Sequence, residues 1–61
     1  MTVDEMIDNI KEGQIAKATY QYDIWYVVMH KGELYYCTRY GEIIKLATVS
    51  PWNTQAEWEL L

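Results

Sequence analysis

Apolar and polar positions at the start of the chain follow a helical rhythm. Apolar side chains recur at i, i+3, i+4 and i+7, the spacing of one helical face, at Val3, Met6, Ile7 and Ile10. Thr2 and Glu5 have the spacing of a capping box, in which each side chain accepts a hydrogen bond from a free backbone N–H. Gly13 can adopt the positive φ that commonly follows a helix. The pattern predicts a helix over residues 3–12.

After Gly13 the pattern changes to that of β-strands. Strands are predicted over residues 14–20, 24–29, 34–38 and 43–46, and a last half-buried edge strand over residues 56–60. The two turns at Gly32 and Gly41 lie nine residues apart, which is the rhythm of a β-meander. Residues 47–55 are predicted to be irregular. We therefore expect a single α+β domain over residues 1–61, with the helix on one face of a four- or five-stranded antiparallel meander.

The central hairpin is predicted to be apolar on both sides. If Lys31 and Gly32 form the whole loop, His30 faces Glu33. One side then carries Trp25, Val27, Met29, Leu34 and Tyr36, and the other carries Ile24, Tyr26, Val28, Tyr35 and Cys37. A three-residue bulged loop would instead shift the faces of the third strand by one residue. In either register the helix covers one side, so we expect the other to meet a second copy of the chain or another partner.

The high content of aromatic residues also supports a surface that binds a second copy of the chain or another partner. The 61 residues include three Trp and six Tyr within an apolar fraction of 51%. Each aromatic side chain has roughly 150–250 Å² to bury, which is more than one small core can hide. We interpret the excess as homo-oligomer interface or ligand surface.

Charge and cysteine usage narrow the class of partner. Nine acidic and five basic residues give a net charge of −4, which argues against direct binding of nucleic acid. No apolar stretch is long enough to span a bilayer, and no signal peptide is evident at Met1. The single Cys37 excludes an intrachain disulfide and fits a reducing cytoplasm. One Cys with one His cannot form a four-ligand zinc site, so no metal is expected.

The sequence does not indicate an enzyme. Cys37 and His30 are the candidate nucleophile and base, and in the simple hairpin register they lie too far apart to share a hydrogen bond. A buried structural cysteine is the favoured interpretation. The three glycines occur at turns or a helix end and form no phosphate-binding loop, so no cofactor is expected.

Aromatic residues next to polar ones provide the candidate binding site. Trp52 could stack on a planar base, and Asn53 could read a base edge or a ribose hydroxyl, on a loop stiffened by Pro51. The same ligand site is predicted to include two tyrosines and two basic side chains that could meet phosphate: Tyr20, Tyr40, Arg39 and Lys17. The alternative is that most of these rings belong to the core or to a subunit interface.

A second candidate surface is the acidic side of the helix. Asp4, Asp8 and Glu12 recur every four residues and could imitate a row of phosphates toward a host protein. The simpler interpretation is an ordinary solvent-facing side, with Asp4 also favoured by the helix dipole. This surface defines the alternative function, a small acidic inhibitor that blocks a host defence protein or a nucleic-acid-processing protein.

Both chain ends resemble a known family. The opening segment over residues 3–13 and the ending Ala56-Glu57-Trp58-Glu59-Leu60 are similar to the ends of the small phage-encoded Thoeris anti-defence sponge proteins of the second type. The resemblance implies a helix packed on an antiparallel sheet, and homo-oligomers with pockets between protomers. It also implies sequestration, without cleavage, of cyclic nucleotide-like immune signals. The family's basic stretch and Trp after the helix are replaced here by residues 14–20, so its pocket residues are not carried over.

Overall fold

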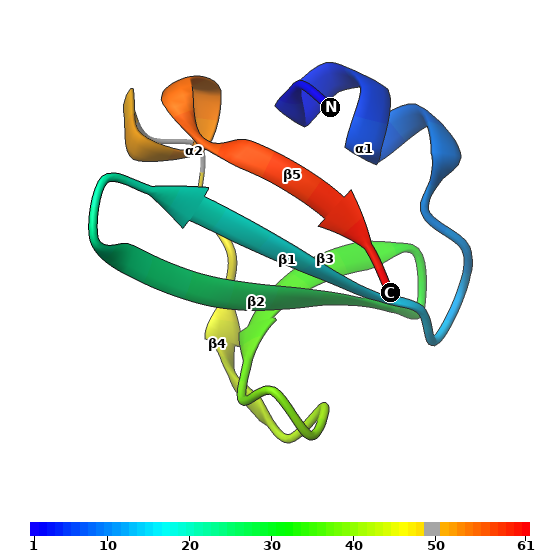
Figure 1. Ribbon diagram of the computed structural model, residues 1–61. Coiled ribbons are helices and arrows are strands. Elements are labelled where there is room, and N and C mark those ends of the chain that lie inside the picture. Colours follow the sequence, from blue (N-terminus) through cyan, green and yellow to red (C-terminus); the bar gives the residue numbers. More distant parts are fainter. Residues whose placement is uncertain (49–50) are drawn as a thin grey trace.

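The chain folds into an N-terminal helix and a five-stranded antiparallel sheet, as predicted, with a second short helix before the last strand. The computed structural model describes residues 1–48 and 51–61, and of residues 51 and 52 the backbone alone. The elements in chain order are α1 (Val3–Asn9), β1 (Ile15–Tyr20), β2 (Asp23–His30), β3 (Glu33–Cys37), β4 (Ile43–Leu46), α2 (Pro51–Gln55) and β5 (Glu57–Leu60). The strand order is β4-β3-β2-β1-β5. Figure 1 shows α1 and α2 on the same side of the sheet, above β1 and β5.

Helix α1 begins where the capping box predicts and ends earlier than expected. The Thr2 hydroxyl accepts from the Glu5 backbone N–H (3.2 Å), and the Glu5 carboxylate accepts from the Thr2 N–H (2.9 Å). The bond from the Thr2 backbone N–H, helped by the Thr2 side chain, lowers the pKa of the Glu5 carboxyl. The predicted end at residue 12 is wrong, because Ile10 is already extended (φ −69°, ψ 138°). Asn9 closes the helix by donating its side-chain amide to the Glu5 carbonyl (2.7 Å).

Glu12 consequently lies outside the helix, where it holds a turn of the sheet. Its carboxylate accepts hydrogen bonds from the backbone N–H groups of Lys31 (2.8 Å) and Gly32 (3.3 Å). The bond from Lys31, helped by the one from Gly32, lowers the pKa of the Glu12 carboxyl. The acidic row predicted along one helix therefore stops at Asp8, since Glu12 is engaged with the β2–β3 turn.

We expect the contribution of Glu12 to stability to depend on pH. Because its pKa in the folded chain is lower than its ordinary value of 4.5, the stabilisation is fully present above that value. It is lost as the pH falls through the lower folded-state pKa. The melting temperature of the wild type should exceed that of Glu12→Gln at neutral pH, and the difference should shrink on acidification. The same change at the exposed Glu59 is the control, and a pH-independent difference for Glu12→Gln would contradict the assignment.

The hairpin between β2 and β3 adopts the simpler of the two predicted registers. His30 pairs with Glu33, and Lys31 and Gly32 form the loop, both with positive φ (52° and 79°). Positive φ at both loop positions is the geometry whose twist suits a two-residue hairpin. The pairs Val27–Tyr36 and Val28–Tyr35 then place the two apolar sets on opposite faces, as predicted for this register.

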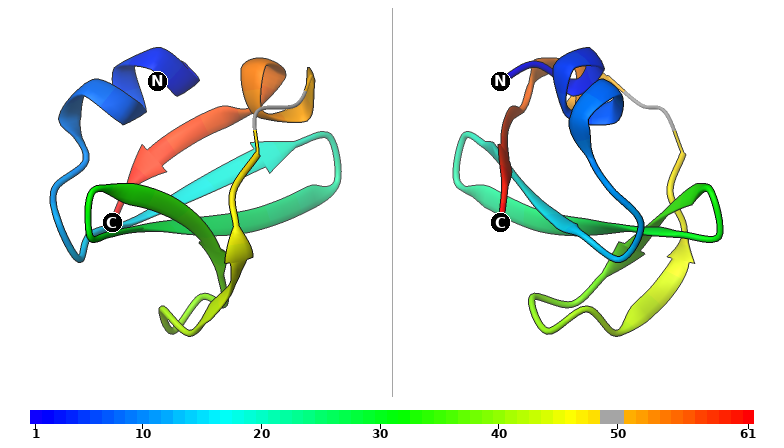
Figure 2. Two further views of the ribbon diagram at one scale, coloured as in Figure 1. Left: turned by 180° about the vertical axis from the view of Figure 1, so that it is seen from behind. Right: turned by 90° about the vertical axis from the view of Figure 1, so that its right-hand side faces the viewer.

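The main core lies between the helices and the sheet. Helix α1 contributes Met6, which is buried against Val27 and Trp58. Ala16 and Ala18 of β1 are fully buried in the same cluster. These alanines are weak strand formers, but their small side chains sit at the centre of the cluster, where bulkier residues would hold the helix away from β1. Figure 2 shows α1 crossing the same side of the sheet in both further views.

The second face of the sheet is partly covered by the chain itself. Cys37 and Val28 lie on this face, yet they are only 5% and 7% exposed. The loop between β3 and β4 bends beneath the sheet, away from the helices (Figure 2). There Gly41, with φ +88°, approaches the Ile15 side chain so closely that an added Cβ would lie 3.3 Å from its Cδ1 atom. The sequence-based expectation that only a partner could cover this face therefore needs correction.

The end of the chain departs from a simple meander. Residues 51–55 form helix α2, whereas we expected residues 47–55 to be irregular. The helix returns the chain to β1, so that β5 pairs with β1 and not with β4. Trp58 is buried while Glu57 and Glu59 are exposed, which confirms the predicted half-buried edge strand.

Candidate functional site

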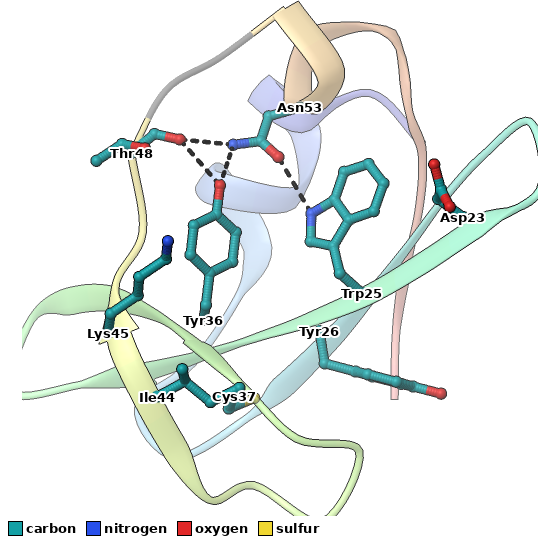
Figure 3. Close-up of a pocket in the computed structure, with 9 residues that line it drawn as sticks. All are labelled: Asp23, Trp25, Tyr26, Tyr36, Cys37, Ile44, Lys45, Thr48 and Asn53. Atoms are coloured by element: carbon teal, nitrogen blue, oxygen red, sulfur yellow. Dashed lines mark hydrogen bonds between the residues drawn. The ribbon is translucent and has the colours of Figure 1, made fainter.

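An open cleft of about 560 Å³ lies at the end of β3, between the first residues of β2 and strand β4. Strand β3 leaves β2 at the pair Tyr26–Cys37, so the residues of β2 before Tyr26 extend beyond β3. On the other side, a bulge opposite Tyr36 and Cys37 makes Ile44 the extra residue of β4. Bulges bend a strand and increase its local twist. The cleft lining shown in Figure 3 consists of Asp23, Trp25, Tyr26, Tyr36, Cys37, Ile44, Lys45, Thr48 and Asn53.

Asn53 organises one wall of the cleft through four hydrogen bonds. Its side-chain oxygen accepts from the indole N–H of Trp25 (3.1 Å). Its Nδ2 atom donates to the Tyr36 hydroxyl (3.1 Å) and to the Thr48 carbonyl (2.7 Å). Its backbone carbonyl accepts from the indole N–H of Trp58 (2.9 Å). One buried amide is thus bonded to both the Trp25 and the Tyr36 ring, which lie side by side beneath it (Figure 3).

Packing restrains the same two rings further. Trp25 meets Trp58 edge to face, with ring centroids 6.3 Å apart and an interplanar angle of 86°. The Tyr36 hydroxyl also donates to the Thr48 carbonyl (3.2 Å). Rings held in this way lose little side-chain freedom when a ligand binds, so less of the contact energy is spent on ordering.

Lys45 and Asp23, which carry opposite charges, lie on the two sides of the aromatic rings of the cleft. Lys45 places its Nζ atom 5.9 Å from the centre of the Tyr36 ring. Asp23 lies on the far side of Trp25, as Figure 3 shows. The cleft therefore offers a cation at one end, aromatic faces in the middle and a carboxylate at the other end. This arrangement suits a planar ligand that has an anionic group at one end and hydrogen-bond donors at the other.

Cys37 lines the cleft but is not arranged as a nucleophile. Burial raises the pKa of its thiol, which favours the protonated, less reactive form. His30 pairs with Glu33, four residues along β2 from the partner of Cys37, and packs edge-on against Tyr35 at 5.9 Å. Within residues 1–48 and 53–61, no group of three or more His, Cys, Asp or Glu side chains is placed to hold a metal ion.

The structure disperses the other residues predicted to bind a ligand. Lys17 is half-buried on the second face of the sheet, opposite Tyr26 of β2. Arg39 and Tyr40 are exposed in the β3–β4 turn, where the guanidinium donates to the Tyr40 hydroxyl (2.9 Å). Tyr20 donates its hydroxyl to the Gln55 side chain (2.8 Å) near α2. None of these four residues lines the cleft.

Of the predicted pair Trp52 and Asn53, Asn53 has a different role from the one expected. The pair lies in helix α2 and not on an irregular loop. The side chain of Trp52 is outside the described part of the chain. Asn53 is 7% exposed, and both hydrogens of its amide donate to other groups of the protein. The amide that we expected to read a ligand instead positions the rings that would contact one.

The cleft as a set of residues was missed by sequence reasoning. The alternation of the central hairpin did place Trp25 and Tyr36 on one face. The contributions of Asp23, Ile44 and Lys45 depend on where β3 leaves β2 and on the bulge in β4. An irregular segment predicted between two strands was the available signal that a cleft could form nearby.

Comparison of the chain with protein-family models, with curated proteins and with solved structures finds no match. Among the described residues, neither helix has the length and apolar character required to cross a bilayer.

Proposed function

We propose that this chain is a non-catalytic binding protein that sequesters a nucleotide-like small molecule. The observation that carries the proposal is the cleft between β2 and β4, whose aromatic walls are held in place by the buried Asn53. Its volume of about 560 Å³ falls within the usual range for small-molecule sites, about 300–1,000 Å³. An aromatic side chain held in a fixed position can stack on any planar base, whatever the identity of that base.

The charges of the cleft support a nucleotide over a simple aromatic compound. Lys45 can meet a phosphate group, and Asp23 can accept hydrogen bonds from an exocyclic amine or a ribose hydroxyl. The protonated state favoured for Cys37, and its separation from His30, support binding without cleavage. The net charge of −4 also fits a small ligand better than the phosphate backbone of a nucleic acid.

The biological role that we propose follows from the resemblance of the two chain ends to the anti-defence sponge proteins. In that role a phage-encoded homo-oligomer holds a cyclic nucleotide-like immune messenger in pockets between subunits, in the cytoplasm of the host. The alternative, an acidic inhibitor of a host protein, has less support. Asp4 and Asp8 remain exposed on α1, but Glu12 lies beyond the helix and is bonded to the β2–β3 turn.

Calorimetric titration with a panel of mononucleotides and dinucleotides tests the proposed function. We expect Trp25→Leu to weaken binding about 5- to 150-fold, because a lost base–aromatic stack is worth roughly 1–3 kcal/mol. The matched control is Tyr22→Leu in the β1–β2 turn, where the ring is fully exposed and outside the cleft. Tyr22→Leu should bind like the wild type, and a thermal melt of each variant reports whether it is folded.

Chromatography of the released ligand tests the non-catalytic part of the proposal. The nucleotide should be recovered intact after prolonged incubation with the protein. Absence of binding by the wild type across the panel at millimolar concentrations would overturn the proposed function. Recovery of cleaved product would overturn sequestration while leaving the binding site in place.

A further inference from the structure

The hydrogen-bonding groups on the aromatic wall of the cleft are already used within the protein. Asn53 donates both hydrogens of its amide and accepts from the Trp25 indole. The Tyr36 hydroxyl accepts from Asn53 and donates to the Thr48 carbonyl, which therefore receives two donors. This wall offers a ligand the faces of its rings. The hydrogen bonds that distinguish one ligand from another must then come from other residues of the lining.

The charged residues that line the cleft, Asp23 and Lys45, are placed differently. Within residues 1–48 and 53–61, neither the Asp23 carboxylate nor the Lys45 ammonium forms a hydrogen bond or an ion pair. The carboxylates of Glu5 and Glu12, by contrast, accept hydrogen bonds from the backbone. A few polar groups that converge on a concave surface are what orient a bound small molecule, and these two side chains are available for that purpose.

The fold places the Asp23 carboxylate at the edge of the Trp25 ring. The two residues lie two positions apart on β2, so their side chains are on the same face of the strand. Asp23 is exposed at the start of the strand, where it pairs with Tyr20 across the β1–β2 turn. Figure 3 shows its carboxylate beside the indole, whereas Lys45 lies beyond Tyr36 on the opposite side. A planar base stacked on Trp25 consequently has one edge toward Asp23 and the other toward Lys45.

The chemistry of a carboxylate limits which base edge Asp23 can recognise. An ionised carboxylate accepts hydrogen bonds through two oxygens and donates none. Guanine presents two donors side by side, its N1–H and its exocyclic amino group, which match the two oxygens. Adenine and cytosine place a ring-nitrogen acceptor next to their amino group, and uracil has one N–H between two carbonyls. On those edges an acceptor lies against one carboxylate oxygen, which is then left without a partner.

We propose that the ligand is a guanine nucleotide and that Asp23 is the residue that selects guanine. The base stacks on Trp25, its N1–H and amino group donate to Asp23, and its phosphate meets Lys45. The order of groups in the molecule fits, because the ribose and phosphate are attached to the five-membered ring, remote from N1. Asp23 and Lys45 likewise lie on opposite sides of the aromatic rings. Selection of guanine rests on the proposed function and names the base that it leaves open.

Calorimetric titration of the wild type with guanosine, inosine and adenosine monophosphates tests the choice of base. Inosine monophosphate differs from the guanine nucleotide only in lacking the amino group. It should bind about 10- to 150-fold more weakly, the fold-change expected for one hydrogen bond to a charged group. Adenosine monophosphate should also bind more weakly than the guanine nucleotide, because it brings an acceptor against the carboxylate. This comparison uses the wild type alone, so it does not depend on the folding of a variant.

Asp23→Asn tests whether Asp23 makes that choice. A side-chain amide has one acceptor oxygen and one donor group, so it cannot accept from both donors of guanine. Xanthine carries a carbonyl in place of the amino group, and its N1–H and carbonyl match the amide. The ratio of guanosine to xanthosine monophosphate affinity should therefore fall by more than about tenfold in the variant. The ratio cancels the general effect of losing a negative charge near anionic ligands.

The matched control is Asp8→Asn, the same change at an exposed position of α1 outside the cleft, which should keep the wild-type ratio. Equal affinity of the wild type for the three monophosphates would overturn the selection of guanine, and so would an unchanged ratio in Asp23→Asn. Either result leaves nucleotide binding, and with it the proposed function, in place. Failure of the wild type to bind any of these nucleotides at millimolar concentrations would overturn the proposed function and the choice of base together.

Discussion

Replacing Trp58 by Ala is expected to unfold a large fraction of the molecules at room temperature. The side chain is 2% exposed, and it packs edge to face against Trp25 within the main core. Truncation of a buried Trp typically costs about 3–5 kcal/mol. Globular domains are stable by about 0.05–0.15 kcal/mol per residue, or about 3–9 kcal/mol for 61 residues. The loss is therefore comparable with the whole stability of the domain.

Urea denaturation followed by far-ultraviolet circular dichroism measures this effect. The companion variant Trp58→Phe retains most of the ring and removes the hydrogen bond to the Asn53 carbonyl. It should lose clearly less stability than Trp58→Ala, with the difference reporting the packing of the indole. A Trp58→Ala variant that unfolds at the same urea concentration as the wild type would show that β5 is not part of the core.

Asn53→Leu is expected to lower both stability and ligand affinity. Leu has a similar volume, but it leaves the Trp25 indole N–H without its partner. The Thr48 carbonyl loses one of its two donors and keeps the Tyr36 hydroxyl. A buried polar group left unpaired costs about 1–3 kcal/mol, so the loss of stability should be measurable and smaller than that expected for Trp58→Ala. Ligand affinity should fall as well, since the two rings of the cleft lose the amide that fixes them.

The control for this variant is Asn9→Leu, an exposed amide that bonds to a helical carbonyl. Surface changes of this kind usually alter stability by less than about 0.5 kcal/mol. Comparing the urea midpoint and the nucleotide affinity of the two variants separates the roles of the amides. If Asn53→Leu melts like the wild type while binding is lost, Asn53 contacts the ligand directly, as the sequence first suggested. If both properties survive, the network around Asn53 is not what holds the cleft.

The hydrogen bonds of Asn53 connect the folding of the chain with the shape of the proposed binding cleft. The amide belongs to α2, while the rings that it holds belong to β2 and β3. No buried side-chain N or O atom in the described part of the chain lacks a hydrogen-bond partner. Asn53, the buried polar residue in that part of the chain, therefore shapes the wall of the cleft.

Local pattern in the sequence was sufficient for the start of α1, for the five strands and for the faces of the central hairpin. The capping box at Thr2 and Glu5 acts within one turn of the chain, so the start of α1 was predictable. The alternation of apolar and polar residues in β2 and β3 narrowed the hairpin register to two options. The structure has the one with a two-residue loop at Lys31 and Gly32. The edge position of β5 followed from the exposed and buried alternation around Trp58. Each of these features depends on interactions between residues close in sequence, or on a strict period of two.

Tertiary contacts decided the features that concern function. Helix α1 ends at Asn9, and Glu12 beyond it bonds to Lys31, which lies nineteen residues further along the chain. Asn53 is a positioning residue because α2 brings it over rings that are 17 and 28 residues away in sequence. The cleft itself exists because β4 is bulged and β3 leaves β2 early, which no local pattern reports. Residue types and spacing determine which face of an element is apolar, whereas a concave site forms only where separate elements fail to pack, and that depends on the whole chain.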